Sequence, residues 1–154
     1  MTPKAVGQSV TRVDARAKVT GRAKYPADFS MPDMLYAKLL FAGRAHARIR
    51  GIDLSDAESA PGVVTILTAK DVPHNAYGLQ IADQPVLCGP GSSQPGADIV
   101  RWVGDQVALI VADTEDAAAA ARDLIHVDYE VLQTVSDPFL ALEPGAPLLH
   151  PPRE

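Results

Sequence analysis

The chain has 154 residues, of which 47% are hydrophobic and 21% are charged, so it is long and apolar enough to fold as one domain with a core. Its net charge of -5 and its aromatic content of 5% argue against a nucleic-acid-binding surface. The single cysteine, Cys88, excludes an internal disulfide and a cysteine-rich zinc or iron–sulfur site. No stretch has the composition of a signal peptide or a membrane span, and we therefore expect a cytoplasmic protein.

The amino-terminal stretch is polar and irregular. We expect residues 1–12 to form an arm that is ordered only where something holds it in place. Beyond it, the dipeptide Thr20-Gly21 indicates a turn, and the residues after this turn are predicted to form a short strand that ends at Asp28.

A mostly apolar strand is predicted for Met34–Phe41, and Gly43 indicates a bulge or bend at its end. Basic side chains then occupy every second position: Arg44, His46, Arg48 and Arg50. In an extended segment they would form a basic ladder on one face, opposite an apolar face. This ladder is our candidate interface with a partner or an anion; the alternative is a solvated strand face.

The next segment contains a short helix, a strand and a long loop. Ser55 and Glu58 fit a capping box for a helix of about two turns, which Pro61-Gly62 ends. A buried strand is predicted for Val63–Leu67. Residues 74–97 are rich in proline and glycine, and a loop of that length is usually either functional or partly mobile.

The stretch Arg101–Leu132 predicts a strand, a helix and a second strand. The apolar run Gln106–Ala112 is typical of a strand covered on both faces. Thr114 can cap a helix whose alanines, residues 117–121, give a smooth surface for close packing on a sheet. After the helix, apolar and acidic residues alternate from Val127 to Val131, as in a strand with one wet face.

The carboxyl-terminal residues have the composition of a linker. Asp137-Pro138 can open a short helix that reaches Leu142. Residues 144–154 are rich in proline, and we expect them to lead toward a cofactor domain that the chain does not contain. Residues 1–154 are thus interpreted as a single domain with an arm and a linker at its ends.

Few residues have the spacing of a catalytic or metal site. The four histidines (His46, His74, His126 and His150) show no metal-binding spacing. The glycines at positions 89 and 91 are not followed by the lysine of a phosphate-binding loop. Cys88 shares its loop with His74, which would suit a nucleophile and its base, but the alternative is that Cys88 is a small buried hydrophobe. We name no catalytic, cofactor-binding or metal residue.

Several short blocks nevertheless resemble the molybdopterin-binding large subunit of the xanthine dehydrogenase/aldehyde oxidase family. They cover nearly the whole chain and follow the family's order. The blocks are Lys18-Val19-Thr20-Gly21 with Ala23, Tyr25 and Asp28, then Ala45–Ile49, Ile52-Asp53, Ala60–Val63, Thr68–Pro73, Val100-Arg101, Gly104-Asp105 with Val107-Ala108, and Val127–Glu130.

This resemblance implies an α+β fold, the α/β-hammerhead, with a mixed sheet and two main helices. In intact relatives a molybdopterin-type molybdenum cofactor hydroxylates aldehydes or N-heterocycles, and electrons leave through iron–sulfur clusters, usually to a flavin. The implied partners are a molybdenum-cofactor domain or subunit, an iron–sulfur subunit and an FAD subunit. The family's cofactor-contacting and catalytic residues lie beyond the hammerhead, so we expect no cofactor within this chain and no catalysis by the chain alone.

Two positions depart from the family's pattern. Many relatives have Arg-Ser-Pro where this chain has Phe41-Ala42-Gly43, and many have glutamine at the position of Asp105. A second hypothesis, from a different functional class, is an autonomous small-molecule-binding domain whose ligand lies under the loop of residues 74–97.

Overall fold

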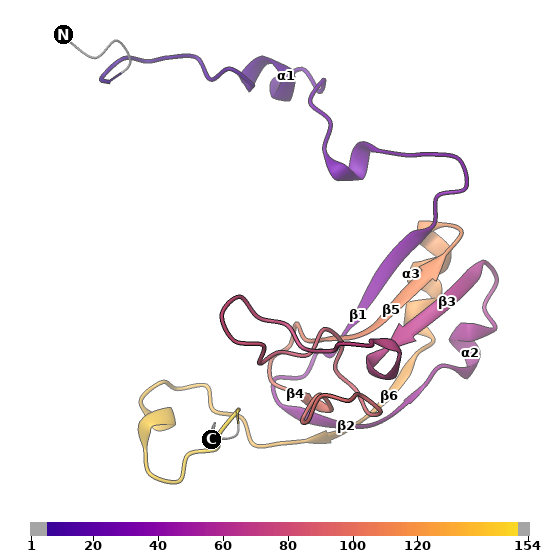
Figure 1. Cartoon of the computed structure of the whole chain (residues 1–154), viewed down its shortest axis with the longest axis vertical. Coiled ribbons are helices and arrows are strands. Elements are labelled where there is room, and N and C mark those ends of the chain that lie inside the picture. Colours follow the sequence, from indigo (N-terminus) through magenta and orange to yellow (C-terminus); the bar gives the residue numbers. More distant parts are fainter. Residues whose placement is uncertain (1–5, 151–154) are drawn as a thin grey trace. The chain divides into compact units, whose positions relative to one another are not determined.

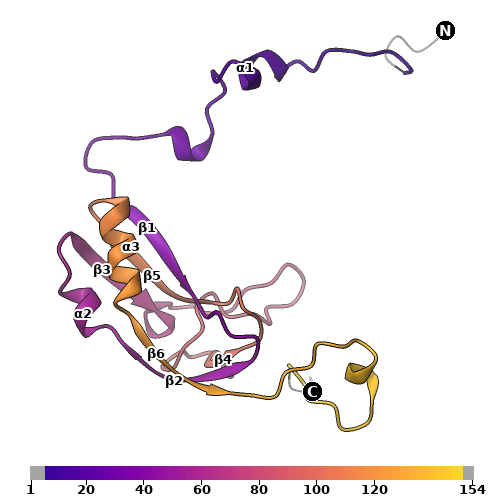
Figure 2. The same cartoon turned by 180° about the vertical axis from the view of Figure 1, so that it is seen from behind.

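The computed structural model describes residues 6–150, and the chain divides into two units, Met1–Met34 and Leu35–Glu154. The second unit, which we call the body, contains all six strands and the longest helix (Figures 1 and 2). No helix among the described residues is long and apolar enough to cross a membrane.

The first sheet of the body is antiparallel and has its longest strand in the middle. Its strand order is β1-β5-β3, with the bounds Tyr36–Phe41, Gln106–Ala112 and Val63–Thr68. Strand β1 ends with a register shift between Leu40 and Phe41, and Gly43 follows with a φ of 60°. The predicted bend at Gly43 is therefore confirmed.

The second sheet is also antiparallel, and strand β2 lies at its centre. Its order is β4-β2-β6, with the bounds Ile99–Val100, Ala47–Asp53 and His126–Val131. The α+β class is confirmed, but the prediction of a mixed sheet is wrong, because β5 and β6 belong to different sheets and every strand pair is antiparallel. The apolar patterns predicted β1, β3, β5 and β6, but they do not specify which strands pair.

Helix α3 (Glu115–Asp123) packs on the first sheet through its alanines. Thr114 caps it as predicted, since its Oγ1 accepts a hydrogen bond from the Ala117 amide at 3.1 Å. Ala118 and Ala121 are fully buried against a cluster that includes Ile110 of β5. Side chains this small let the helix axis come close to the strands.

Strand β5 links two cores because it is apolar on both faces. Ala108, Ile110 and Ala112 belong to the cluster beneath α3, whereas Val107 belongs to a second cluster with Cys88 and residues of β2. Successive side chains of a strand point to opposite faces, so the run contributes to both cores. The prediction of a strand covered on both faces is confirmed only in part, because Val107 is buried on the second face whereas Leu109 and Val111 are half-buried.

Helix α2 (Ser55–Glu58) is shorter than predicted and begins differently. It has one turn rather than two, and the residue at its amino-terminal cap position is Leu54. The carboxylate of Asp53, not the Ser55 hydroxyl, accepts the local bonds, from the Ser55 amide at 3.0 Å and the Ser55 hydroxyl at 2.6 Å. The predicted capping box is wrong because this aspartate takes up the serine hydroxyl.

The amino-terminal unit contains helix α1 (Ala15–Val19) and a 3-10 turn (Pro26–Asp28). The strand predicted to end at Asp28 is therefore wrong, although the turn at Thr20-Gly21 is confirmed. The Asp28 carboxylate accepts a hydrogen bond from the Tyr25 amide at 3.0 Å, which stabilises a turn in place of a strand. The prediction of a separate arm ending at residue 12 falls partly outside the described residues and stays a prediction.

The close packing of α3 predicts a sharp difference between two alanines of the same helix. Ala121→Leu should destabilise the body by about 1–3 kcal/mol, because the added carbons have no space beneath the helix. Ala120→Leu, at an exposed position, should change the free energy of unfolding by less than about 0.5 kcal/mol. Urea unfolding followed by circular dichroism measures both, and equal effects would contradict this packing.

Candidate functional site

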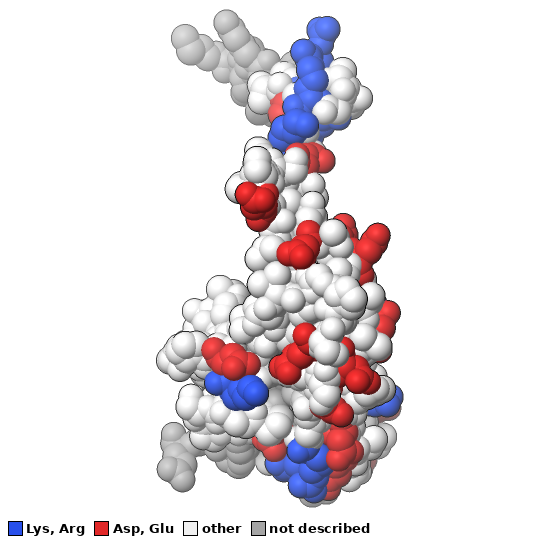
Figure 3. Space-filling model, turned by 90° about the vertical axis from the view of Figure 1, so that its right-hand side faces the viewer, with Lys and Arg blue, Asp and Glu red and all other residues white. Residues whose placement is uncertain are grey.

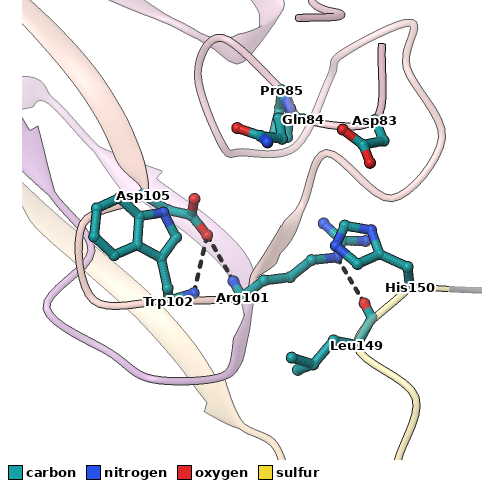
Figure 4. A pocket seen from close by; sticks show the side chains of 8 residues that line it. All are labelled: Asp83, Gln84, Pro85, Arg101, Trp102, Asp105, Leu149 and His150. Atoms are coloured by element: carbon teal, nitrogen blue, oxygen red, sulfur yellow. Dashed lines mark hydrogen bonds between the residues drawn. The ribbon is translucent and has the colours of Figure 1, made fainter. Parts of the chain in front are cut away.

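The turn from Arg101 to Asp105 connects β4 to β5 and is stabilised by one carboxylate. Asp105 Oδ2 accepts hydrogen bonds from the backbone amides of Arg101 at 2.6 Å and Trp102 at 3.2 Å (Figure 4). The Asp105 amide in turn donates to the Trp102 carbonyl at 3.2 Å. The carboxylate is thus committed to shaping the turn, which fixes the direction of the neighbouring side chains.

The guanidinium group of Arg101 is bound to three backbone carbonyls. Nε donates to the Leu149 carbonyl at 2.7 Å, and one terminal nitrogen donates to the carbonyls of Gly96 at 3.2 Å and Ile99 at 3.0 Å. The side chain therefore connects the carboxyl-terminal segment, the end of the long loop and β4. An arginine with so many bonds to the protein is a positioning group rather than a free anion receptor.

An open hollow of about 360 Å³ lies beside this turn. Figure 4 shows the side chains that line it: Asp83, Gln84, Pro85, Arg101, Trp102, Asp105, Leu149 and His150. A neighbouring hollow of about 290 Å³ shares four of them and adds Tyr77, Val86, Gly104 and Gln106. Both hollows are partly open to solvent rather than fully enclosed cavities.

Trp102 lines both hollows, and its indole lies against Gly104. A Cβ added to Gly104 would lie 2.2 Å from Cη2 of Trp102, so only glycine lets the ring lie flat on the turn. The ring is still 60% exposed, which is unusual for tryptophan in a folded domain. A rigid aromatic surface of this kind is suited to contact with another protein.

The loop of residues 74–97 is fastened by a buried amide. The Asn75 side chain is 1% exposed and forms a two-way pair with Leu87: its Nδ2 donates to the Leu87 carbonyl at 2.8 Å, and its Oδ1 accepts from the Leu87 amide at 2.9 Å. Nδ2 also donates to Ser92 Oγ at 2.9 Å. The space under the loop is filled by its own residues, since Leu87, Cys88 and Ala97 are buried there. This filling does not favour a ligand under the loop.

Cys88 is a core residue. Its thiol is 1% exposed and contacts the Ile99 carbonyl at 3.8 Å, whereas His74 is exposed. Burial, with a smaller contribution from the negative charge of Asp105, raises the pKa of the Cys88 thiol to about 12. A thiol that stays protonated at neutral pH is a poor nucleophile, so the small-hydrophobe alternative describes Cys88.

The basic ladder is only partly present. His46 does not belong to an exposed basic face: it is 8% exposed, and its Nδ1 lies 2.6 Å from the Gln133 carbonyl. Arg48 forms ion pairs with Asp98 and Glu130, and Arg50 also pairs with Glu130. This part of β2 is therefore a network of mixed charge.

Arg44 lies apart from this network. Its guanidinium carbon is 5.5 Å from the centre of the Tyr129 ring, a cation–π arrangement. Burial of the Tyr129 ring raises the pKa of its hydroxyl. The structure thus brings Arg48 and Arg50 together on β2. Arg44, which lies on the ring of Tyr129 in β6, and the buried His46 are separate from this pair.

The histidines and carboxylates do not converge. Among residues 6–150, no group of three or more histidine, cysteine, aspartate or glutamate side chains is placed to hold a metal ion. The ion pair between Lys38 of β1 and Glu115 of α3 lowers the pKa of the Glu115 carboxyl, and it attaches the helix to the sheet.

Comparison with known proteins identifies the family. The sequence profile described as "Aldehyde oxidase and xanthine dehydrogenase, a/b hammerhead domain" matches residues 20–133. The chain belongs to this family. The resemblance inferred from the short blocks and the hammerhead fold are both confirmed.

The relatives of this hammerhead domain are much longer proteins. A probable xanthine dehydrogenase subunit of Bacillus subtilis is 45% identical over 143 residues, which are 92% of this chain and 18% of the relative. "Nicotinate dehydrogenase large molybdopterin subunit" of Eubacterium barkeri is 38% identical over 146 residues, 94% of this chain and 32% of the relative. The chain thus spans less than a third of either protein.

A solved structure gives the same assignment. The crystal structure of the Cu,Mo-CO dehydrogenase superposes with a TM-score of 0.78 and 36% sequence identity, over 92% of this chain and 17% of that one. The match at this identity supports the hammerhead fold of the body independently of the sequence profile.

The two departures from the family's pattern have a structural explanation in this hammerhead domain. The amides of Ala42 and Gly43 donate to the carbonyls of Asp105 at 2.8 Å and Val103 at 3.0 Å. Proline at position 43 could neither donate this bond nor adopt a φ of 60°. The Asp105 carboxylate accepts hydrogen bonds from the amides of Arg101 and Trp102 instead, so each departure has a structural role of its own.

Sequence reasoning missed Asn75 and Trp102. Asn75 is the chain's single asparagine and stands in a loop without periodicity, so its sequence context does not distinguish it from an ordinary turn residue. Trp102 is the single tryptophan, and its position between a strand and a Gly-Asp turn could have indicated an exposed ring.

The fastening of the loop by Asn75 predicts the effect of its removal. Asn75→Ala should destabilise the body by about 1–3 kcal/mol, because the Leu87 amide and carbonyl would stay buried without a partner. The Leu87 amide should also exchange its hydrogen with solvent more rapidly. Gln80→Ala, at an exposed position in the same loop, is the control. Unchanged exchange at Leu87 would refute this role.

The raised pKa of Cys88 predicts a thiol without reactivity. Iodoacetamide at pH 8 should leave the folded protein unmodified and should alkylate it fully in urea, as measured by intact mass. Because the pKa of the folded state lies above that of the unfolded state, this thiol stabilises the fold below about pH 9 and the contribution is lost as the pH rises toward 12. Rapid alkylation of the folded protein would contradict its burial.

Proposed function

We propose that this chain is the hammerhead portion of a molybdenum-cofactor hydroxylase, with a structural and docking role and no catalysis of its own. The observation that supports the proposal most strongly is the family match over residues 20–133. The region that aligns with this chain makes up 18% and 32% of two relatives. This small share supports the view that the hydroxylation reaction is carried out by other parts of the enzyme.

Residues 6–150, which the structure describes, do not fit a molybdenum cofactor by themselves. The Cys88 thiol is buried in the core, and the His46 ring nitrogen Nδ1 lies within hydrogen-bond distance of the Gln133 carbonyl. The side chains of Asp105 and Arg101 are hydrogen-bonded to backbone groups. When present in the complete enzyme, the cofactor would supply the oxygen transfer and the redox chemistry. We assign this chain the role of supporting the part of the enzyme that holds it.

The proposed partners are the molybdenum-cofactor domain or subunit, an iron–sulfur subunit and an FAD subunit. Support comes from the two relatives, since one is described as a subunit of a probable xanthine dehydrogenase and the other as a "large molybdopterin subunit". A cytoplasmic location, which a single cysteine fits, stays a prediction. So does the interpretation of residues 144–154 as a linker.

Three of the ladder residues, Arg44, Arg48 and Arg50, remain our proposed contact surface, without the buried His46. Arg44 on the Tyr129 ring supplies the residue types that are enriched at protein interfaces. Strand β6 is an edge strand, so one row of its backbone groups is open to a partner strand or loop. The network of Arg48, Arg50 and Glu130 would then select the partner by charge pattern.

Metal analysis tests the proposed function directly. The purified chain should contain no molybdenum and should not oxidise aldehydes or N-heterocycles with a dye as electron acceptor. The enzyme isolated from the source organism should contain this polypeptide together with stoichiometric molybdenum. Molybdenum retained by the chain alone, or turnover without partners, would refute the proposal.

A further inference from the structure

The amino-terminal unit has a charge opposite to that of the body. Residues 1–34 contain six of the 14 lysines and arginines but three of the 19 acidic residues, a net charge of +3, whereas residues 35–154 carry -8. Figure 3 shows the basic side chains gathered on the amino-terminal segment and mostly acidic ones on the visible face of the body. Such a separation indicates an electrostatic role for the segment.

The backbone of residues 6–34 nonetheless has a regular local structure. Helix α1 ends in a Schellman motif: the Arg22 amide donates to the Ala17 carbonyl at 2.9 Å, and the Gly21 amide donates to the Lys18 carbonyl at 3.1 Å. Gly21 has a φ of 69°, the left-handed conformation that this motif requires. The block Lys18–Gly21, which matched the family, is thus the end of a helix.

Local polar bonds hold the rest of the unit. Asp14 pairs with Arg12 at 2.5 Å and with Lys18 at 2.8 Å, and the hydrogen bond from Lys18 holds the pKa of the Asp14 carboxyl below its usual value. Within residues 6–34, the hydrogen bonds and ion pairs join groups at most six positions apart. The side chains of Arg16 and Lys24 have no such partner among the described residues.

This defined backbone has no core of its own. No residue from 6 to 34 is buried. Its exposed large apolar side chains are Val6, Val10, Val13, Val19, Tyr25, Phe29 and Met31. This segment keeps a specific backbone conformation although none of its side chains is buried. Its exposed apolar side chains are therefore suited to packing against another surface.

The aligned length shows that relatives share part of this segment. The family profile begins at residue 20, yet the alignment with the large molybdopterin subunit of Eubacterium barkeri covers 94% of this chain. That coverage leaves at most about nine of the 154 residues outside the alignment, so at least about ten of the 19 residues that precede the profile are inside it. The segment therefore recurs together with a larger enzyme.

We infer that residues 6–34 are a preshaped docking arm that binds an acidic groove with an apolar floor on the molybdopterin-binding part of the enzyme. This inference rests on the proposed function. Arg16 and Lys24 would meet carboxylates of the groove, and the exposed valines and aromatic rings would fill its floor. The Schellman turn at Gly21 presents both sets of side chains without the cost of ordering a disordered segment.

Cross-linking and hydrogen exchange on the intact molybdenum-containing enzyme test the arm. A zero-length carbodiimide reagent should join Lys18 or Lys24 to aspartates or glutamates of the molybdopterin-binding part. The amides of Arg22 and Ala23 should exchange at least tenfold more slowly in the enzyme than in the isolated chain. Exchange at the same rate in both, or cross-links confined to residues 35–154 of the same chain or of a second copy, would overturn the inference.

Two matched pairs of variants separate charge from shape. Arg16→Glu combined with Lys24→Glu should abolish the protection, whereas Lys70→Glu, at an exposed position of the body, should not. Gly21→Ala should reduce the protection at least tenfold without changing any charge. Gly145→Ala is its control, because Gly145 also has a positive φ of 86° and nothing within 4 Å of an added Cβ.

The outcomes also distinguish this inference from the proposed function. If the enzyme contains molybdenum but the amides of the arm exchange as fast as in the isolated chain, the docking arm is refuted and the proposed function is not. An enzyme that contains this chain but no molybdenum would refute the proposed function and the partner named here with it.

Discussion

The body depends on a single strand that must be apolar on both of its faces. One face of β5 receives the alanines of α3, and the other reaches the cluster around Cys88 and β2. A polar residue at an inward position of either face would leave a buried group without a partner. This constraint explains why Gln106–Ala112 is the longest apolar run of the chain, and why the two three-stranded sheets form one body although they share no strand.

Much of the body could be predicted because its information is local. The cap at Thr114, the smooth alanine face and the bend at Gly43 each follow from the properties of one or a few neighbouring residues. The pairing of strands could not be predicted in the same way, since antiparallel and mixed sheets use the same alternation of side chains. The helix at residues 15–19 was missed because its five residues bury nothing and so have no apolar periodicity.

The candidate contact surfaces show the same division. Alternating basic residues correctly placed Arg48 and Arg50 near each other, but their partners Asp98 and Glu130 come from other parts of the chain and cannot be found by spacing along β2. His46 failed as a ladder member because it precedes the first residue of the strand, where the alternation does not yet apply. Asn75 acts through hydrogen bonds to a residue distant in the sequence, and Trp102 acts through its exposed ring. The local sequence pattern predicts neither property.

The backbone hydrogen bonds between residues 42–43 and the turn at 103–105 limit how the sequences of hammerhead domains can differ at these positions. Gly43 donates to Val103, and Ala42 donates to Asp105, although the two segments lie far apart in the sequence. A chimera that received the proline-containing tripeptide of many relatives at 41–43 would lose one of these donors and force a new backbone path beside the Trp102 ring. The tripeptide at 41–43 is thus constrained by the turn that precedes β5: its third residue must keep both an amide hydrogen and a positive φ for the junction between the sheets to keep this form.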